Sequence, residues 1–315
     1  MARDLLFIAS QVFIPYKFTN IFYMLTKNRI TLFLVMLMMS ITYAQSDIST
    51  AEKLLNSGDD KEAETLLLEH DSELKAIELL GDIYSFRKNW DMAISKYEHL
   101  VKAKPNNSNY NFKLGGALGM KAYYGSKFQA AMLIGDVKKH LLKAAELDPN
   151  HSESRRALVE LYMQIPGFVG GSQTMAESYA SELHRINELD GLLADAYIYK
   201  FLDYQKLAET KYEAAIKLSR RKPELITRNY LNYELAEVAA IYSIELDHGQ
   251  SLVKCYIENY GYKDIKDPSW AYYRWAQIER LNKNQDVALN YIKKSLEIAP
   301  NFDKALIEKQ KIQRM

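Results

Sequence analysis

A step of twelve residues between small side chains constrains the fold of this sequence more than any other feature. The step is clearest in the stretch 74–107, where Gly81 and Ala93 stand twelve apart and Pro105 follows twelve after Ala93. The apolar residues around them keep helical spacing, and Pro105 cannot continue a helix. We therefore expect two helices packed as a hairpin, with a turn near residues 87–89, because the small residues let the two backbones approach closely.

The same step recurs along the chain. Near the C-terminus it is repeated by Ala276, Ala288 and Pro300, and weaker copies are Ala51 to Ala63, Ala196 to Ala208 and Ala239 to Ser251. In two further, stretched copies the spacing is longer. Pro149 lies ten residues beyond the position that two steps from Gly115 would give, and Ala176 lies five residues beyond one step from Val159. One hairpin cannot bury its apolar face alone, so neighbouring hairpins must stack. The pattern predicts seven hairpins in one continuous domain, 45–315, with residues 301–313 as an amphipathic cap.

The strongest copy carries a recognisable motif. Ile77-x2-Leu80-Gly81-x2-Tyr84, followed by Ala93-x3-Tyr97 and Pro105, resembles the tetratricopeptide repeat (TPR) pattern at nearly every marked position. The resemblance implies an all-α fold, a right-handed superhelical solenoid of about seven helical hairpins plus a C-terminal capping helix. A Pro-Gly-apolar-apolar-Gly-Gly insert at 166–171, with Leu-Asp-Pro-Asn at 147–150, also resembles a group of exported bacterial TPR proteins of unassigned biochemical function.

The N-terminal region resembles an export signal. Lys27 and Arg29 precede fifteen uncharged residues, 30–44, that end with small residues at Thr42 and Ala44. This pattern indicates a signal peptide over 24–44, cleaved after Ala44, because fifteen apolar residues are short of the roughly 20 needed to span a bilayer. Residues 1–23 are interpreted as an upstream extension from an early start site; an uncleaved anchor is the alternative. We therefore expect a periplasmic or secreted protein.

Charge and cysteine content limit the kinds of partner and of covalent linkage. Residues 45–315 contain 37 Lys and Arg against 39 Asp and Glu, a net charge of −2, so the composition does not favour nucleic acid as a partner. Cys255 is the single cysteine, which excludes a disulfide within one chain. We expect its thiol to be buried in the second helix of a hairpin.

The TPR resemblance implies that the first helices of the hairpins line a concave surface that binds a protein or peptide. The residues beside the packing positions mix both signs of charge with aromatic groups: Glu78, Asp82, Arg156, Glu160, Tyr197, Lys200, Tyr273, Gln277 and Arg280. This lining departs from the run of basic residues expected of a clamp for a C-terminal carboxylate. An extended segment with mixed charge and an apolar anchor is the more natural ligand.

Two other segments stand out. The Gly-rich insert ends without Gly-Lys-Ser/Thr, so it is not a phosphate loop; Pro166 would end one helix and Ser172 or Thr174 would cap the next. Its tip, with Phe168, Gly170 and Gly171, is a second candidate contact for a partner. An aromatic cluster near the C-terminus is too dense for one seam to bury, so part of it is expected to face a groove: Tyr260, Tyr262, Trp270, Tyr272, Tyr273 and Trp275.

No motif for catalysis is recognisable. The six histidines form no His-Glu-x-x-His pair and no metal-ligand spacing, and no nucleophile turn such as Gly-x-Ser-x-Gly appears. We therefore predict no catalytic residues, no metal and no cofactor. The favoured function is an exported scaffold that binds a partner protein or an extended peptide. The alternatives are an accessory factor in cell-wall or outer-membrane assembly, and an enzyme with an unrecognised site.

Overall fold

A computed structural model of the protein describes residues 45–264 and 266–315. The chain divides into two compact units, Met1–Thr50 and Ala51–Met315. Of the first unit only residues 45–50 are described, and they are helical. The predicted upstream extension, 1–23, and the predicted signal peptide, 24–44, lie outside the described residues. Throughout the described ranges the regular structure is helical, without a strand.

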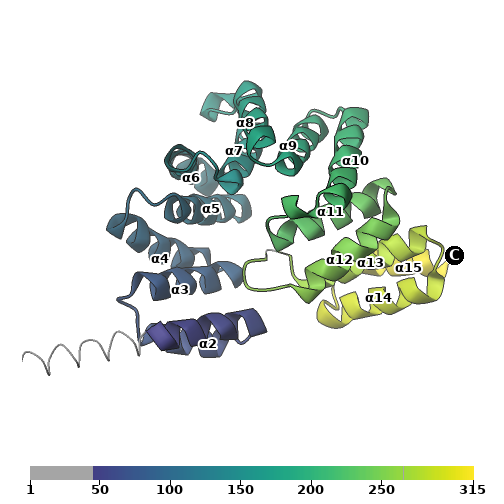
Figure 1. The fold of residues 1–315 in the computed structure, drawn as a ribbon, viewed down its shortest axis with the longest axis horizontal. Helices are drawn as coiled ribbons and strands as arrows, with labels where there is room; N and C mark the ends of the chain where they lie inside the picture. The colour runs from purple at the N-terminus through teal and green to yellow at the C-terminus, as the bar shows by residue number, and fades with distance from the viewer. Residues whose placement is uncertain (1–44, 265) are drawn as a thin grey trace, which may run out of the picture. The chain divides into compact units, whose positions relative to one another are not determined.

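The helices form the seven hairpins and the cap that the sequence predicts (Figure 1). The first hairpin of the unit 51–315 joins helical residues 51–57 to α2 (Asp60–Leu68). The first helices of the next six hairpins are α3 (Leu74–Phe86), α5 (Ser108–Tyr124), α7 (Ser152–Gln164), α9 (Glu188–Phe201), α11 (Asn229–Tyr242) and α13 (Pro268–Leu281). Their second helices are α4 (Trp90–Ala103), α6 (Lys127–Leu147), α8 (Gln173–Ile186), α10 (Gln205–Arg221), α12 (Leu246–Glu258) and α14 (Gln285–Ile298). The capping helix is α15 (Asp303–Gln313), and short 3₁₀ turns occur at Gly167–Val169 and Pro223–Leu225.

Small residues hold the two helices of a hairpin together, as the twelve-residue step predicts. A Cβ placed on Gly81 would lie 2.5 Å from the ring of Tyr97, so only glycine admits that ring here. The alanine pairs of three other hairpins are fully buried: Ala51 and Ala63, Ala196 and Ala208, Ala276 and Ala288. The close approach lets larger side chains such as Leu80 and Leu100 fill the seam beside it.

The sixth hairpin, α11–α12, corrects two sequence predictions. Its close contact is made by Gly249, where a Cβ would meet the Cβ of Ala239 at 2.6 Å; Ser251, the predicted residue, is exposed. The predicted register was wrong by two residues, because Ala239 lies nearer the end of its helix than Gly81 does in α3. For the same reason Cys255 is exposed rather than buried.

The third hairpin, α5–α6, is longer than its neighbours, with helices of 17 and 21 residues against 13 and 14 in α3 and α4. This length accommodates the ten extra residues of the stretched copy. Val137 occupies the buried small-residue position, and the extra turns expose Tyr123, Phe128 and Met132. The Ser126 side chain begins α6 with a capping box that includes Gln129.

The connection between α12 and α13 returns to the beginning of the same unit. Figure 1 shows this connection extending toward α3. The ring centroid of Tyr260 lies 6.3 Å from that of Phe86. Tyr262 is buried, which raises the pKa of its hydroxyl, and the nearby carboxylate of Asp82 raises that pKa further. Phe86 and Tyr260, 174 positions apart in the sequence, are therefore in contact, and the unit 51–315 closes on itself.

Candidate partner-binding face

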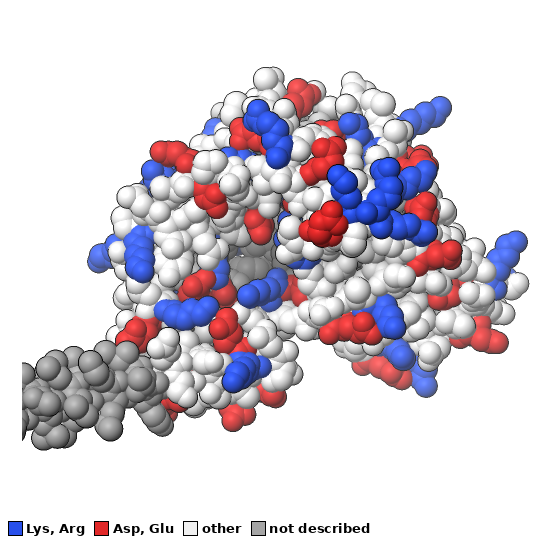
Figure 2. Space-filling view, viewed as in Figure 1, with Lys and Arg blue, Asp and Glu red and all other residues white. Residues whose placement is uncertain are grey.

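The nine residues predicted to line the concave surface all lie on first helices, α3, α7, α9 and α13, and the structure arranges them in three polar clusters. The space-filling view shows Lys, Arg, Asp and Glu side chains gathered around a hollow in the unit 51–315 (Figure 2). The first two clusters join first helices of successive hairpins, and the third joins α13 to the capping helix α15 and to α11. Charged side chains therefore link α3 to α5, and they link α7, α9, α11, α13 and α15 in a second series along this face.

The first cluster links α3 to α5. The Lys113 ammonium donates to Glu78 and to Asp82, each at 2.7 Å, and the hydroxyl of Tyr97 donates to Asp82 at 2.7 Å. Burial by itself lowers the pKa of Lys113, but the two carboxylates outweigh it and raise that pKa above its ordinary value. Glu78 and Asp82 are therefore already paired within the chain.

The second cluster lies in the middle of the face and links α7, α9 and α11. Arg156 donates to Glu234 at 2.6 Å and lies 3.7 Å from the carboxylate of Asp190. Asp190 is fully buried and also accepts two hydrogen bonds from Arg228, at 2.6 and 3.0 Å. The sequence patterns did not single out Asp190, Arg228 or Glu234, because nothing local shows that three helices bring these charges together.

Two buried polar atoms of this central cluster have no hydrogen-bond partner: Arg156 Nη1 and Glu234 Oε2. Nearby, burial raises the pKa of Glu160; Arg156 opposes that shift and Glu234 adds to it. Buried polar groups are normally paired, since an unpaired one costs about 1–3 kcal/mol. The cluster therefore contains one buried donor and one buried acceptor outside hydrogen-bond distance of any partner in the described chain, although Arg156 Nη1 is ion-paired with Asp190 at 3.7 Å.

The predicted residues Tyr197 and Lys200, on α9, lie at the border of the central cluster. The amide of Gln164 donates to the Tyr197 hydroxyl at 2.9 Å, and the Tyr197 ring lies 6.3 Å from that of Phe201. Lys200 is exposed. Tyr197 is close enough to Glu160 and Arg156 for their charges to act on the pKa of its hydroxyl, and it provides an aromatic edge to the central cluster.

The third cluster lies at the C-terminal end and contains the predicted residues Tyr273, Gln277 and Arg280. Arg280 donates to Glu308, a carboxylate of α15 that is only 1% exposed, and Gln277 donates to the Tyr273 hydroxyl at 3.0 Å. A groove of about 580 Å³ opens here between α11, α13 and α15. Arg274, which also lines the groove, was not predicted; it pairs with Glu237 of α11.

The C-terminal aromatic cluster is divided among three surroundings. Tyr262 is buried near α3, and Trp275 and Tyr272 stack on Tyr291 of α14, at 4.0 and 6.3 Å between ring centroids. Tyr273 is the member that lines the groove. The expected groove therefore exists, but most of the aromatic cluster packs inside the fold.

The Gly-rich insert is a structured turn. Gly170 adopts φ of +96°, and a Cβ on Gly171 would lie 1.9 Å from the carbonyl oxygen of Ile165, so both positions require glycine. The Ser172 side chain caps α8 by accepting a hydrogen bond from the Met175 amide, as predicted. Phe168 is 91% exposed at the tip of the insert.

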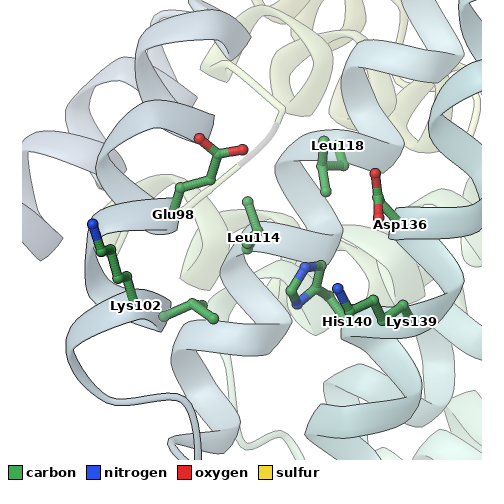
Figure 3. Close-up of a pocket in the computed structure, with 8 residues that line it drawn as sticks. Glu98, Lys102, Leu114, Leu118, Asp136, Lys139 and His140 are labelled. Carbon is green, nitrogen blue, oxygen red and sulfur yellow. The ribbon is translucent and has the colours of Figure 1, made fainter.

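A second pocket, of about 340 Å³, lies between α4, α5 and α6 (Figure 3). Figure 3 shows Glu98 and Lys102 on one side of it and Asp136, Lys139 and His140 on the other. His140 faces Asn111 at 3.0 Å, and its pKa is lowered by burial and by Lys139. Two of the three helices that line this pocket, α4 and α6, are second helices. None of the lining residues belongs to the three clusters, so the pocket is separate from them.

Within residues 45–264 and 266–315, no group of three or more His, Cys, Asp and Glu side chains is placed to hold a metal ion. In the same ranges no helix combines the length and the apolarity that crossing a membrane requires.

Neither family models nor curated proteins match this chain, whereas solved structures of TPR proteins resemble it in fold. A TPR protein from Parabacteroides merdae is 14% identical, with a TM-score of 0.47, and the match covers 86% of this chain and 98% of that one. A TPR protein from Thermus thermophilus is 16% identical, with a TM-score of 0.47 over 59% and 96% of the two chains. Pseudomonas aeruginosa PilF is 14% identical, with a TM-score of 0.41 over 78% and 98%. The described residues form a solenoid of helical hairpins with the small-residue contacts given above.

Proposed function

We propose that this protein is an interaction scaffold that binds an extended segment of a partner protein on the face formed by its first helices. The observation that carries the proposal is the central cluster, where Arg156 Nη1 and Glu234 Oε2 are buried without a hydrogen-bond partner. Arg156 Nη1 lies 3.7 Å from Asp190 Oδ1, so its charge is compensated although the separation is too long for a hydrogen bond. A peptide backbone offers both a carbonyl oxygen and an amide hydrogen, the partners that the two atoms would gain if the side chains around them moved aside on binding.

The surroundings of the cluster support recognition of a segment rather than of a small molecule. Tyr197 and Lys200 continue the face beyond the central charges, and the groove at α11, α13 and α15 continues it at the other side. A peptide that extends along several hairpins can contact several of these groups at once. The signal-like sequence at 24–44 further supports a role outside the cytoplasm, which is part of the proposal.

Site-specific photocrosslinking in the native cell tests this function. The full chain would carry a benzoylphenylalanine at Tyr197, on the first-helix face, or at Lys293, an exposed residue of the second helix α14. Benzoylphenylalanine keeps an aromatic ring at position 197 and removes the hydroxyl that accepts a hydrogen bond from Gln164. We expect the same partner to be crosslinked from position 197 in repeated preparations, and not from position 293.

The opposite pattern, with a partner crosslinked from position 293 and none from position 197, would show that the second helices form the binding surface. As a further control, circular dichroism of both labelled proteins should match that of the unlabelled chain.

A further inference from the structure

The groove at the C-terminal end of the face has an excess of positive charge. Among the residues that line it, four are cations, Arg274, Arg280, Lys304 and Lys311, and one is a carboxylate, Glu308. Glu308 already receives Arg280 and lies 3.5 Å from the Lys311 ammonium, while Arg274 pairs with Glu237. The carboxylates of Glu308 and Glu237 thus pair with Arg280, Lys311 and Arg274. Lys304 pairs with no carboxylate of the described chain.

Lys304 and Lys266 flank the same indole. Their ammonium nitrogens lie 5.2 and 4.4 Å from the ring centroid of Trp270. A cation–π contact of this kind stabilises a positive charge less than a paired carboxylate does. Burial lowers the pKa of Lys266, Glu237 opposes the shift, and Lys304, Arg274 and Lys88 add to it by repulsion. Cations that repel one another at this position favour an anionic ligand.

A buried arginine indicates that the groove is built rather than accidental. The Arg274 side chain is 7% exposed, donates to Gln277 at 2.7 Å and to Glu237, and still has its Nε without a partner. Placing a guanidinium this deeply is costly unless its charge is compensated. An anion in the groove would add to that compensation.

The rim of the groove is aliphatic. Ile241 and Ile307 are 48% and 54% exposed on α11 and α15, and both line the groove beside the cations. Exposed isoleucines next to charged groups are typical of surfaces that bind a protein segment, since a free inorganic anion leaves them in water. The volume of about 580 Å³ is also within the range of ligand-binding grooves.

We propose that the groove between α11, α13 and α15 binds an acidic segment of the partner protein, with carboxylates directed at Lys304 and Arg280 and aliphatic side chains against Ile241 and Ile307. This inference rests on the proposed scaffold function and specifies the chemistry of its partner. The acidic residues can lie anywhere in the partner sequence, since the groove is open and its cations come from two helices.

The test measures binding of defined fluorescent peptides to the full chain by fluorescence anisotropy. The probe is Gly-Glu-Leu-Asp-Ile-Glu-Leu-Gly, compared with a neutral version that has Gln and Asn at the acidic positions and with hexaglutamate. We expect the acidic aliphatic peptide to bind at least about tenfold more tightly than the neutral one, with an affinity that falls as salt rises. Inorganic phosphate should not compete with the acidic peptide when the total ionic strength is held constant.

Paired substitutions on α15 locate the binding. Lys304→Glu should weaken the peptide by about tenfold or more, whereas Lys309→Glu, the same charge change at an exposed position outside the groove, should change it by less than about twofold. Ile307→Ser should weaken binding where Leu306→Ser, on the same helix and outside the groove, does not. Lys304→Gln is a milder variant that keeps the result interpretable if Lys304→Glu reduces stability.

Equal binding of the acidic and neutral peptides, equal effects of Lys304→Glu and Lys309→Glu, or efficient competition by phosphate would each overturn the inference. The scaffold function has its own readout, because crosslinking from Tyr197 reports on the centre of the face and does not depend on this groove. A partner crosslinked at position 197 together with no acidic-peptide binding would therefore reject the groove assignment alone.

Discussion

At the scale of single residues, the central cluster contains two glutamates with opposite effects on stability. Burial raises the pKa of Glu160 above its ordinary value of 4.5, so the folded protein favours the neutral carboxyl. Stability associated with this group is fully present below pH 4.5 and is lost as pH rises through the higher folded pKa. Glu234 instead accepts a hydrogen bond from Arg156 at 2.6 Å, so its charge is used within the fold.

We therefore expect Glu160→Gln to raise the free energy of unfolding at neutral pH by roughly 1 kcal/mol, and the gain to vanish near pH 4.5. Glu234→Gln is the matched control and should lower it by about 1–3 kcal/mol, because Arg156 loses a charged acceptor. Urea unfolding at several pH values measures both effects. A destabilised Glu160→Gln protein at pH 7 would show that this carboxylate is needed in its ionised form.

At the scale of elements, hairpins are held by the smallest residue at the point where two helices approach most closely. Gly249 of α12 faces the Cβ of Ala239 and the side chain of Ile278, and an added Cβ would lie 2.6 and 3.1 Å from them. Gly135, in the middle of α6, has nothing within 4 Å of the same position. Contact between helices, rather than helical conformation, therefore decides whether a glycine is required.

Gly249→Ala should destabilise the protein by about 1–3 kcal/mol through overpacking of α11, α12 and α13. Gly135→Ala should instead stabilise it by up to about 1 kcal/mol, because alanine favours the helix and meets no neighbour. Thermal unfolding of the two variants measures the difference. Effects of the same sign would contradict the register that places Gly249, and not Ser251, in the seam.

At the scale of the whole molecule, tyrosines are distributed through the stack as core residues. Burial raises the pKa of many of them, with nearby carboxylates adding to the shift in Tyr97 and Tyr256, and the pKa of Tyr260 rises to about 12. The folded state thus holds these protons more tightly than the unfolded state does. Its stability is intact below pH 10 and falls as pH rises toward the folded pKa values.

Alkaline titration should accordingly show one cooperative transition above pH 10, in which most of the phenolate absorbance appears together with the loss of helical circular dichroism. The contact of Tyr260 with Phe86 makes the closing connection part of this transition. Tyr260→Leu, which keeps an apolar side chain without an ionisable group, should shift the transition to higher pH. Phenolate formation with helicity retained would show that the buried tyrosines are accessible to hydroxide in the folded protein.

The local sequence determined the repeating unit, because helix periodicity, a small residue at each crossing and a terminating proline act within about 34 residues. It therefore predicted the seven hairpins, the cap and the positions of the candidate residues on first helices. The two stretched copies differ in where the extra residues go: they lengthen α5 and α6 in the third hairpin, and they form the Gly-rich turn between α7 and α8 in the fourth.

Only the tertiary structure decided which charges meet. Asp190, Arg228 and Glu234 join Arg156 across three hairpins, and Lys304 reaches the groove of Arg274 from the cap. Such contacts depend on how each hairpin is rotated against the next, which is a sum of small packing differences that no local motif encodes. The return of Tyr262 to α3 has the same origin, because it requires the accumulated curvature of the whole stack rather than any property of residues 259–264.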